Sequence, residues 1–167
     1  MYMDLEQIGR RFSKMGSKSD FKEFDLSIRI EKIIKYLGKR LPSLGQTVKL
    51  ENDIQPGIIM RANGSLLAWS IENIIKNSID SIDQRRGKIS ISLRKDLNEI
   101  KIRIKDNGKG IPKKDWKNIF RPGFSTKKAG WGLGLSLANR IIEDIHKGNL
   151  RVLNSTINKG TIIEIIL

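Results

Sequence analysis

The amino-acid sequence predicts an α+β fold, a two-layer α/β sandwich in which about three helices pack on one face of a mixed, mostly antiparallel sheet. Two patterns indicate this fold. Apolar and polar residues alternate strictly over 89–93 and 100–104, as in half-buried strands. Apolar residues recur every three or four positions over 64–83 and 133–145, as on the buried face of a helix. The chain has 167 residues, 38% of them hydrophobic, which suits one domain with a core.

The first 20 residues are predicted to be an appendage. Apolar residues recur at helical spacing over 5–15, and 16–20 has the glycine and serine content of a linker. A helix this short is marginal in water when it stands alone. We therefore expect residues 1–20 to be a helical remnant with a linker, and 21–167 to form the domain.

The first half of the domain is predicted to alternate strands and helices. Alternating apolar residues predict a strand over 24–28. Helical spacing over 30–37 predicts a helix that ends before Pro42, because proline cannot continue a helix. Short apolar runs at 48–50 and 58–60 predict two further strands.

The second half of the domain begins with the long helix predicted over 64–83. The two alternating stretches then predict an antiparallel hairpin over 89–104, closed by a tight connection. Residues 106–131 have no clear period and are rich in glycine and lysine, which predicts a long functional loop. A helix over 133–145 and two strands within 150–167 complete the predicted fold.

The composition narrows the classes of function. The formal net charge is +14, from 32 Lys+Arg and 18 Asp+Glu, but the basic residues are scattered and aromatic residues make up only 6%. We therefore expect a solvated basic surface and no nucleic-acid partner, since a single-strand binder needs aromatic stacking platforms. Cysteine is absent and His146 is the only histidine, which excludes disulfides, cysteine nucleophiles, cysteine-ligated zinc and a multi-histidine metal site within one chain.

Membrane and secretion signals are not found in this sequence. No apolar run approaches the roughly 20 residues that span a bilayer. Charged residues interrupt the start of the chain, where a signal peptide would lie. We therefore expect no membrane segment in this chain and a cytoplasmic location, which the absence of cysteine also fits.

The first of four short motifs lies on the long predicted helix. Asn73 and Asn77 are one turn apart, on the side opposite the apolar face, so their amides can converge on one ligand. An amide oxygen is a suitable ligand for Mg²⁺, and an amide NH₂ can reach a phosphate oxygen. Taken alone, the pair is equally compatible with a solvent-exposed helix face.

The second motif follows the hairpin directly. Asp106 stands at the end of a strand and is followed by Gly108 and Gly110. The carboxylate can accept a hydrogen bond from an exocyclic amine, and the glycines allow a flat ligand to approach the backbone closely. A plain Asp-Asn-Gly turn is the alternative.

The third and fourth motifs lie in and just after the aperiodic region. Phe120 and Phe124 are apolar anchors for a flap, or aromatic residues that pin a loop to the core, and the Ser-Thr-Lys tract over 125–127 could face phosphates. Glycines over 130–134 precede a helix, where unpaired amides and the helix dipole favour an anion. Their spacing fits neither the Rossmann fingerprint nor the P-loop.

In this order, the four motifs resemble the N, G1, F and G2 boxes of the GHKL ATP-binding superfamily, which includes gyrase-like ATPases, heat-shock chaperones, mismatch-repair ATPases and sensor histidine kinases. The resemblance extends over about 21–167, and Gly160-Thr161 resembles the family's closing Gly-Thr. It implies a Bergerat-type fold with a long ATP lid, and ATP and Mg²⁺ as cofactors.

One position points to a branch of this superfamily. The ATPase branches have a glutamate that activates water one turn before the second asparagine, and Asn73 stands there in this chain. An amide cannot act as a general base, and the N-x-x-x-N pattern resembles a sensor histidine kinase. Many such kinases have a basic residue where this chain has Asp80, so Lys76 or Lys127 would supply positive charge instead.

The resemblance assigns roles to individual residues. Asp106 resembles the aspartate that recognises the adenine amine, Asn77 the magnesium ligand, and Asn73 a polar contact to the phosphates. The two asparagines are the catalytic candidates. The full set expected to bind ATP is Asn73, Lys76, Asn77, Asp106, Gly108, Gly110, Ile111, Phe120, Phe124, Ser125, Thr126, Lys127, Gly130, Gly132, Leu133, Gly134, Leu135 and Thr161.

A histidine kinase also needs an acceptor histidine, and nothing around His146 matches a phosphoacceptor motif. We therefore expect the catalytic domain of a two-component sensor, which phosphorylates a histidine on a separate or upstream dimerisation hairpin and signals to a response regulator. The parent of such a domain is often anchored in the inner membrane. Two alternatives remain at this stage: a serine kinase of the anti-sigma-factor type, and a non-catalytic basic nucleic-acid binder.

Overall fold

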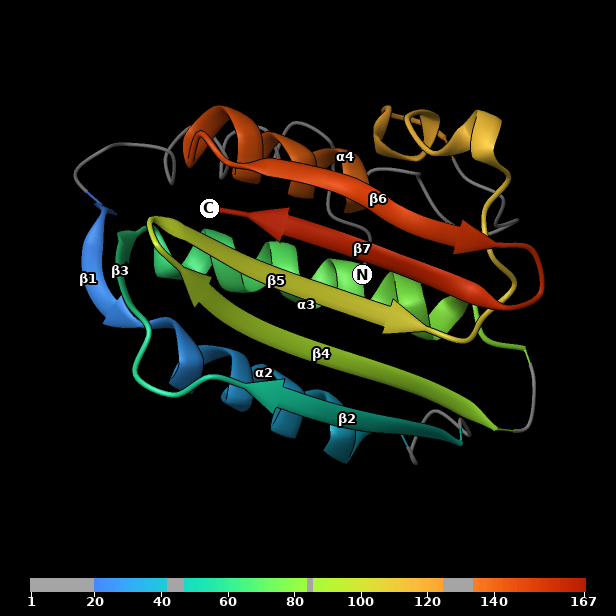
Figure 1. Cartoon of the computed structure of the whole chain (residues 1–167), viewed down its shortest axis with the longest axis horizontal. Coiled ribbons are helices and arrows are strands. Elements are labelled where there is room, and N and C mark those ends of the chain that lie inside the picture. Colours follow the sequence, from blue (N-terminus) through green and yellow to red (C-terminus); the bar gives the residue numbers. More distant parts are fainter. Residues whose placement is uncertain (1–19, 42–46, 84–85, 125–133) are drawn as a thin grey trace, which may run out of the picture.

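The computed structural model describes residues 20–41, 47–83, 86–124 and 134–167, and the predicted N-terminal helix lies outside them. A five-stranded sheet forms one layer, and helices α2, α3 and α4 lie on one of its faces (Figure 1). Strands β1 and β3 form a separate two-stranded sheet at one end. The predicted α+β two-layer sandwich is confirmed. Within the described residues, no helix is long and apolar enough to cross a bilayer.

The elements follow one another along the chain as short strands, helices and tight turns. Their bounds are β1 (Lys22–Asp25), α2 (Leu26–Arg40), β2 (Val48–Ile54), β3 (Ile59–Ala62), α3 (Gly64–Asp80), β4 (Gly87–Asp96), β5 (Glu99–Asp106), the 3₁₀ helices η3 (Lys113–Asp115) and η4 (Asn118–Phe120), α4 (Gly134–Arg140), the π-helix η5 (Ile141–Ile145), β6 (Asn149–Thr156) and β7 (Gly160–Ile166).

The strand order of the main sheet is β2-β4-β5-β7-β6. The predicted hairpin is confirmed as β4 and β5, which pair antiparallel from Ile89 with Asp106 to Asp96 with Glu99. Strands β5, β7 and β6 are also antiparallel neighbours, whereas β2 pairs with β4 in parallel. The parallel pair is possible because α3 lies between these two strands in sequence, and parallel neighbours need such a crossover.

The core lies between the sheet and α3. Alternate residues of β4 and β5 are fully buried on the helix side, and so is the apolar face of α3. These residues are Leu67, Ile71, Ile74, Ile75, Ile89, Ile91, Leu93, Ile102 and Ile104. The predicted long helix is confirmed, although it ends at Asp80, three residues before the predicted end.

The strand predicted over 24–28 is wrong in its second half. Strand β1 ends at Asp25, and α2 begins at Leu26. The Asp25 carboxylate accepts a hydrogen bond of 3.0 Å from the backbone N–H of Ile28, which makes Asp25 the N-cap of α2. An N-cap aspartate thus converts an apparently alternating pattern into the first turn of a helix.

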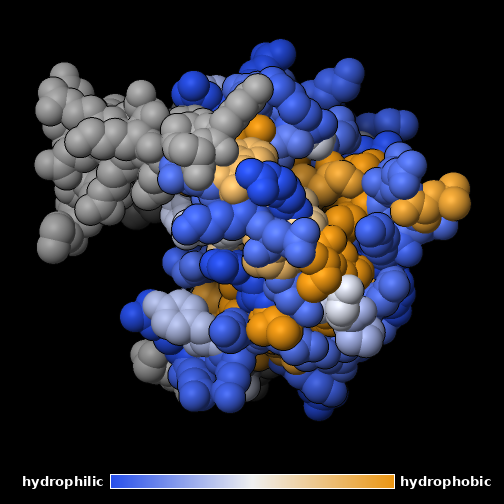
Figure 2. Space-filling view, turned by 90° about the vertical axis from the view of Figure 1, so that its left-hand side faces the viewer, coloured by the Kyte–Doolittle hydropathy of each residue, from blue (hydrophilic) through white to orange (hydrophobic). Residues whose placement is uncertain are grey.

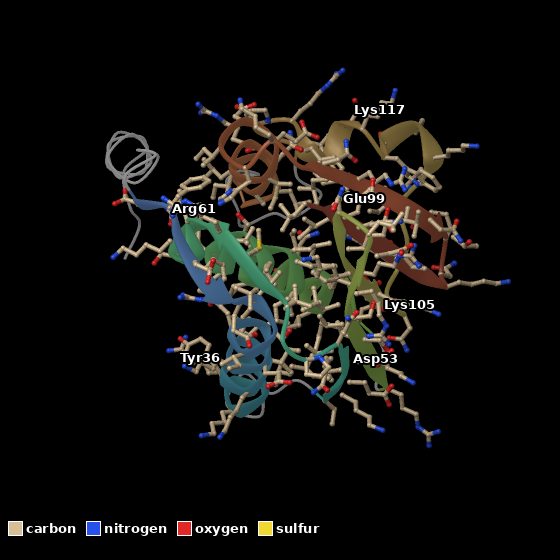
Figure 3. The ribbon with its side chains drawn as sticks, turned by 60° about the vertical axis from the view of Figure 1, so that its left-hand side comes forward. Tyr36, Asp53, Arg61, Glu99, Lys105 and Lys117 are labelled. Carbon is tan, nitrogen blue, oxygen red and sulfur yellow. The ribbon has the colours of Figure 1, made fainter. Side chains whose placement is uncertain are left out.

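The helix-free face of the sheet carries charged side chains. Lys105 of β5 and Asp53 of β2 lie on this side, whereas Tyr36 of helix α2 lies on the opposite side of the molecule (Figure 3). Glu164 of β7 is fully buried here between Arg103 and Arg151, its partners on the two neighbouring strands, with N···O distances of 2.7 and 2.6 Å. Desolvation raises the pKa of Glu164, but hydrogen bonds from both arginines hold it below its ordinary value.

The end of the molecule that bears β1 and β3 has a mixed surface. Hydrophilic residues cover most of it, and apolar residues reach the surface between them (Figure 2). Ile28 of α2 is 49% exposed and Ile59 of β3 is 46% exposed. Exposed apolar side chains of this kind are normal on a folded domain.

The last helix changes its hydrogen-bond pattern before it ends. Helix α4 continues as the π-helix η5, and the backbone N–H of His146 bonds to the carbonyl of Ile141, five residues earlier, at 3.1 Å. The His146 ring stacks on Phe21 with centroids 5.1 Å apart. Its Nδ1 donates to the Ile141 carbonyl and its Nε2 accepts from the backbone N–H of Asn63, the N-cap of α3.

Candidate nucleotide-binding site

Asp106 occupies the last position of β5, at the end of the sheet. The residue is only 5% exposed. Its Oδ1 accepts the backbone N–H of Gly108 at 2.9 Å. Ser78, Ser81 and the backbone N–H of Thr161 also favour the charged form of the carboxylate. The Ser81 hydroxyl donates to the Ser78 carbonyl at 2.8 Å. The Asp106 side chain is thus held in one orientation at the junction of β5, β7 and the C-terminal turn of α3.

The charge of Asp106 is subject to two opposing effects. Burial raises its pKa, and the hydrogen bonds from Gly108, Ser78, Thr161 and Ser81 lower it, with burial the stronger effect. A carboxylate in such a position is a good acceptor for a buried amine, because desolvation strengthens the hydrogen bond.

The glycines after Asp106 serve the packing of the loop. A β-carbon on Gly108 would lie 2.2 Å from Oγ of Ser81, and one on Gly110 would lie 2.3 Å from the carbonyl oxygen of Thr156. Gly110 also has a positive φ of 74°, which favours glycine. Protein atoms therefore occupy the space next to both α-carbons. That the adenine base of a nucleotide approaches this loop closely stays a prediction.

The two asparagines of α3 differ in their contacts. Nδ2 of Asn73 donates to the carbonyl of Trp69 at 2.9 Å, and a β-carbon on Gly134 would lie 3.6 Å from its Oδ1. The first and fourth motifs therefore meet where α4 begins beside α3. Asn77 is half-buried, and among the described residues its amide has no hydrogen-bond partner. A hard amide oxygen that is still available fits a magnesium ligand.

The charged residues around these asparagines are already paired. Nζ of Lys76 lies 2.9 Å from Glu72, one turn earlier on α3, so this lysine would have to leave that pair to reach a phosphate. Asp80, where related kinases are expected to have a basic residue, is exposed at the end of the same helix. No group of three or more histidine, cysteine or acidic side chains that could hold a metal ion occurs within the described ranges.

The segment after Asp106 is anchored on the protein rather than free. The backbone N–H of Ile111 donates to Oγ of Ser155 at 2.8 Å, and its carbonyl accepts from Nε1 of Trp116 at 3.0 Å. Phe120 is partly buried against the core, as an anchor should be, and Phe124 is half-buried. Figure 3 shows Lys117 on this segment of 3₁₀ turns.

The structure brings together part of the predicted site. Asp106, Gly108, Gly110 and Thr161 meet at one end of the sheet, where Oγ1 of Thr161 lies 2.8 Å from Oγ of Ser155. Gly134 and Leu135 begin α4 beside α3. The remaining predicted residues lie outside the described part of the chain: Ser125, Thr126, Lys127, Gly130, Gly132 and Leu133.

Sequence reasoning missed Ser78 and Ser81 as site residues. Ser78 is 2% exposed and belongs to the buried face of α3. A hydroxyl among apolar residues on a buried helix face must find a partner, and that requirement is the signal that could have marked it. Ser81 carried no comparable signal, because a serine after a helix end is ordinary.

This fold, with a buried carboxylate beside a helix that carries two asparagines, defines a nucleotide-binding domain. The family of histidine kinase-, DNA gyrase B- and HSP90-like ATPases matches residues 63–167, and the chain belongs to that family. The chain is 33% identical over 122 residues to Sporulation kinase B of Bacillus subtilis, covering 73% of this chain. It is 40% identical over 105 residues to the signal transduction histidine-protein kinase AtoS of Escherichia coli, covering 62% of this chain.

A solved structure agrees with these relatives. The catalytic domain of the histidine kinase ThkA superposes with a TM-score of 0.75 and 26% identity, covering 88% of this chain and 94% of that one. The chain is therefore a catalytic ATP-binding domain of the sensor histidine kinase type, and the relatives support neither the serine-kinase nor the nucleic-acid alternative. It spans only 28% of Sporulation kinase B and 16% of AtoS.

Proposed function

We propose that this domain binds ATP with Mg²⁺ and transfers the γ-phosphoryl group to a histidine on a separate or upstream helical hairpin. Family membership supports the use of ATP. One observation favours transfer to a protein over hydrolysis. Asn73 stands at the sequence position where the resemblance expects the water-activating glutamate of the ATPases, and its amide donates to the Trp69 carbonyl. An amide cannot take a proton from water near neutral pH.

In this proposal, Asp106 accepts a hydrogen bond from the adenine amine. A nucleobase without that amine leaves the buried acceptor unpaired, which is why the site prefers adenine. Asn77 has the available amide oxygen that would hold Mg²⁺, with the nucleotide's phosphates as further ligands, since Mg²⁺ is usually bound by few protein groups. The ion would neutralise charge on the phosphates when it is bound.

The protein prepares the γ-phosphate by position. Asn73 on α3 and the start of α4 at Gly134 lie side by side, so one amide and the N-terminal end of a helix can face the same phosphates. Holding two reactants in the right geometry supplies much of the barrier reduction in phosphoryl transfer. The acceptor histidine must then be brought to this position by the hairpin.

The downstream partner in this proposal is a response regulator. The histidine kinase ThkA, which shares the fold of this chain, has been solved in complex with the response regulator protein TrrA. We propose that the parent of this domain acts in the same kind of two-component pair. Residues 1–20 would then be the end of the hairpin together with a linker.

The test is incubation of the full chain with γ-labelled ATP, with and without a histidine-bearing hairpin from the parent or from Sporulation kinase B. We expect label on the hairpin only, acid-labile and alkali-stable, as phosphohistidine is. Asp106→Asn should weaken the transfer, because it lowers the affinity for ATP. Acid-stable label on another protein would favour a serine kinase, and the absence of label on any hairpin would contradict the proposal.

A further inference from the structure

The outward face of helix α2 carries a row of lysines. With a rotation of about 100° per residue, four exposed residues fall within about 60° of one another, opposite the buried side of the helix. They are Ile28, Lys32, Lys35 and Lys39. At a rise of about 1.5 Å per residue, the row is about 16 Å long. Because all four side chains are exposed, no other described element covers this face.

The three lysines of this row have no acidic partner among the residues that the structure describes. The open face of the sheet is different, because most of its basic residues lie in ion pairs. Lys49 and Lys88, for example, both pair with Glu51, at N···O distances of 3.0 and 2.9 Å. Helix α2 has five basic residues and a single acid, Glu31. Its outward face therefore presents positive charge that is available to an anionic partner.

The same face carries an aliphatic and an aromatic side chain. Ile28 is 49% exposed at one end of the row, and Tyr36 is 46% exposed beside it (Figure 3). The guanidinium of Arg40 lies over the Tyr36 ring, 4.7 Å from its centroid, which adds a positive charge at this place. Each exposed side chain would be ordinary alone. Together they suit the boundary between water and lipid, where tyrosine lies at the level of the headgroups and lysine keeps its charge in water while its stem covers apolar surface.

We propose that this face of α2 is a docking surface for an anionic lipid bilayer, with the lysine row against the headgroups. The shape of the face favours this partner, because a straight, convex row of charges matches a flat and deformable surface. The type of charge favours it too. Lysine is a compact point charge that suits diffuse negative charge, whereas recognition of single carboxylates, phosphates or nucleic acid relies mainly on the planar fork of arginine.

This surface is separate from the nucleotide site. No residue of the row belongs to the set expected to bind ATP, so the proposal stands or falls independently of the proposed phosphoryl transfer. The formal net charge of +14 draws the whole domain toward any anionic surface. A test must therefore separate the α2 face from the general charge of the molecule.

The experiment measures how tightly the full chain binds to lipid vesicles in a sedimentation assay. The vesicles contain either phosphatidylcholine alone or phosphatidylcholine mixed with phosphatidylglycerol. The row variant is the triple substitution Lys32→Gln, Lys35→Gln and Lys39→Gln. Glutamine is a good helix former, so the row variant should keep the fold, which circular dichroism checks.

A matched control removes the same charge from another place. Lys113, Lys114 and Lys117 are exposed on the 3₁₀ segment of η3 and η4, and their triple change to glutamine is the charge control. For the apolar contact, Ile28→Ser is compared with Ile157→Ser. The Ile157 side chain is 50% exposed, as Ile28 is, but it lies in the turn between β6 and β7.

We expect the wild type to bind the mixed vesicles and to release them as salt is raised. The row variant should lose affinity by about fivefold per lysine, or about 100-fold in all, because each lysine near an anionic surface contributes separately. The charge control should lose less than about fivefold. Ile28→Ser should weaken binding by about threefold and Ile157→Ser should not, since only the former removes apolar area from the contact.

Equal losses in the row variant and the charge control would overturn the proposal, because general charge would then explain the binding. Failure of the wild type to bind the mixed vesicles, or equal binding to phosphatidylcholine alone, would also overturn it. A DNA duplex and polyglutamate are measured in parallel. If the row variant loses affinity for either of these and keeps its affinity for the mixed vesicles, the face belongs to a different partner and the lipid surface is rejected.

Discussion

The carboxylate of Asp106 is the one buried acceptor to which the sequence motif and the structure both lead. Asp106→Asn keeps the shape of the side chain and an acceptor for Gly108, but it presents an NH₂ group where the adenine amine would donate. We expect the fold to persist and ATP affinity to fall by about tenfold or more, because an unmet buried hydrogen bond costs about 1–3 kcal/mol. Calorimetry with ATP and GTP checks this, and an undiminished preference for ATP would contradict it.

Asn77 leads to a second prediction at the scale of single residues. Asn77→Ala removes the available amide oxygen and leaves the buried face of α3 untouched. We expect ATP binding without Mg²⁺ to be little changed and the increment that Mg²⁺ adds to be lost. The measurement is ATP affinity with and without Mg²⁺ in both proteins. If the variant keeps the full increment, the magnesium ligand is another residue, with Asp80 the next candidate.

Single residues also show what the sequence can and cannot reveal. Asp106, Asn73 and Asn77 were predicted because their spacing forms a motif. Ser78 and Ser81 favour the charged form of Asp106 only because α3 packs against the end of β5, a contact between residues about 25 positions apart that no local pattern records. The expected roles of these residues toward ATP remain predictions.

At the scale of elements, the start of α2 depends on one cap. The Asp25 carboxylate satisfies the N–H of Ile28 at 3.0 Å, and Asp25→Ala leaves that donor without its partner. We expect a loss of about 1 kcal/mol in the free energy of unfolding, measured by urea denaturation. Asp25→Asn keeps an acceptor and should lose much less. Equal losses in the two variants would show that the cap bond is not the cause.

His146 connects three elements, since it stacks on Phe21, bonds to Ile141 in η5 and accepts from Asn63 at the start of α3. Burial lowers its pKa, against a smaller opposite effect of the Ile141 carbonyl. The unfolded chain therefore binds the proton more tightly than the folded chain. The contribution of His146 to the free energy of unfolding is therefore fully present above about pH 6.5, the ordinary pKa of histidine, and it decreases as the pH drops below that value.

The corresponding test replaces the ring. His146→Gln should lower stability near pH 7.5 and flatten its dependence between about pH 6.5 and 5 relative to the wild type, because the titrating group is gone. Urea denaturation at a series of pH values gives both quantities. A wild-type slope that survives unchanged in the variant would assign the pH dependence to the carboxylates instead.

The elements were predicted well where one period dominates a long stretch, as in α3 and the β4–β5 hairpin. The prediction failed at 24–28, because alternation over five residues cannot be separated from a capped first helical turn. The π-helix η5 was also not predicted, since the apolar spacing of 133–145 fits an α-helix and a one-residue insertion leaves little trace in it.

For the whole molecule, the two layers and the mostly antiparallel sheet could be predicted from the sequence. The neighbours of strands β1, β2 and β3 could not. The parallel position of β2 beside β4 depends on how α3 crosses the sheet, and the separate β1–β3 sheet on where α2 begins. The nucleotide site depends on the same packing, because the end of β5, the loop after it and α3 must meet before any motif can act together.

The last prediction concerns the activity of the domain by itself. The side chain of Asn73 is an amide, which cannot take a proton from water near neutral pH, and it donates to the Trp69 carbonyl. The neighbouring Glu72 is paired with Lys76. Neither residue is therefore a free base that could activate water. A general base contributes about 10²- to 10⁴-fold to such a reaction, and its absence should leave hydrolysis slow. We expect phosphate release by the isolated chain to stay near that of Asp106→Asn, which cannot hold ATP well. Phosphate release that is rapid in the wild type and lost in Asp106→Asn would instead identify a hydrolytic member of the family.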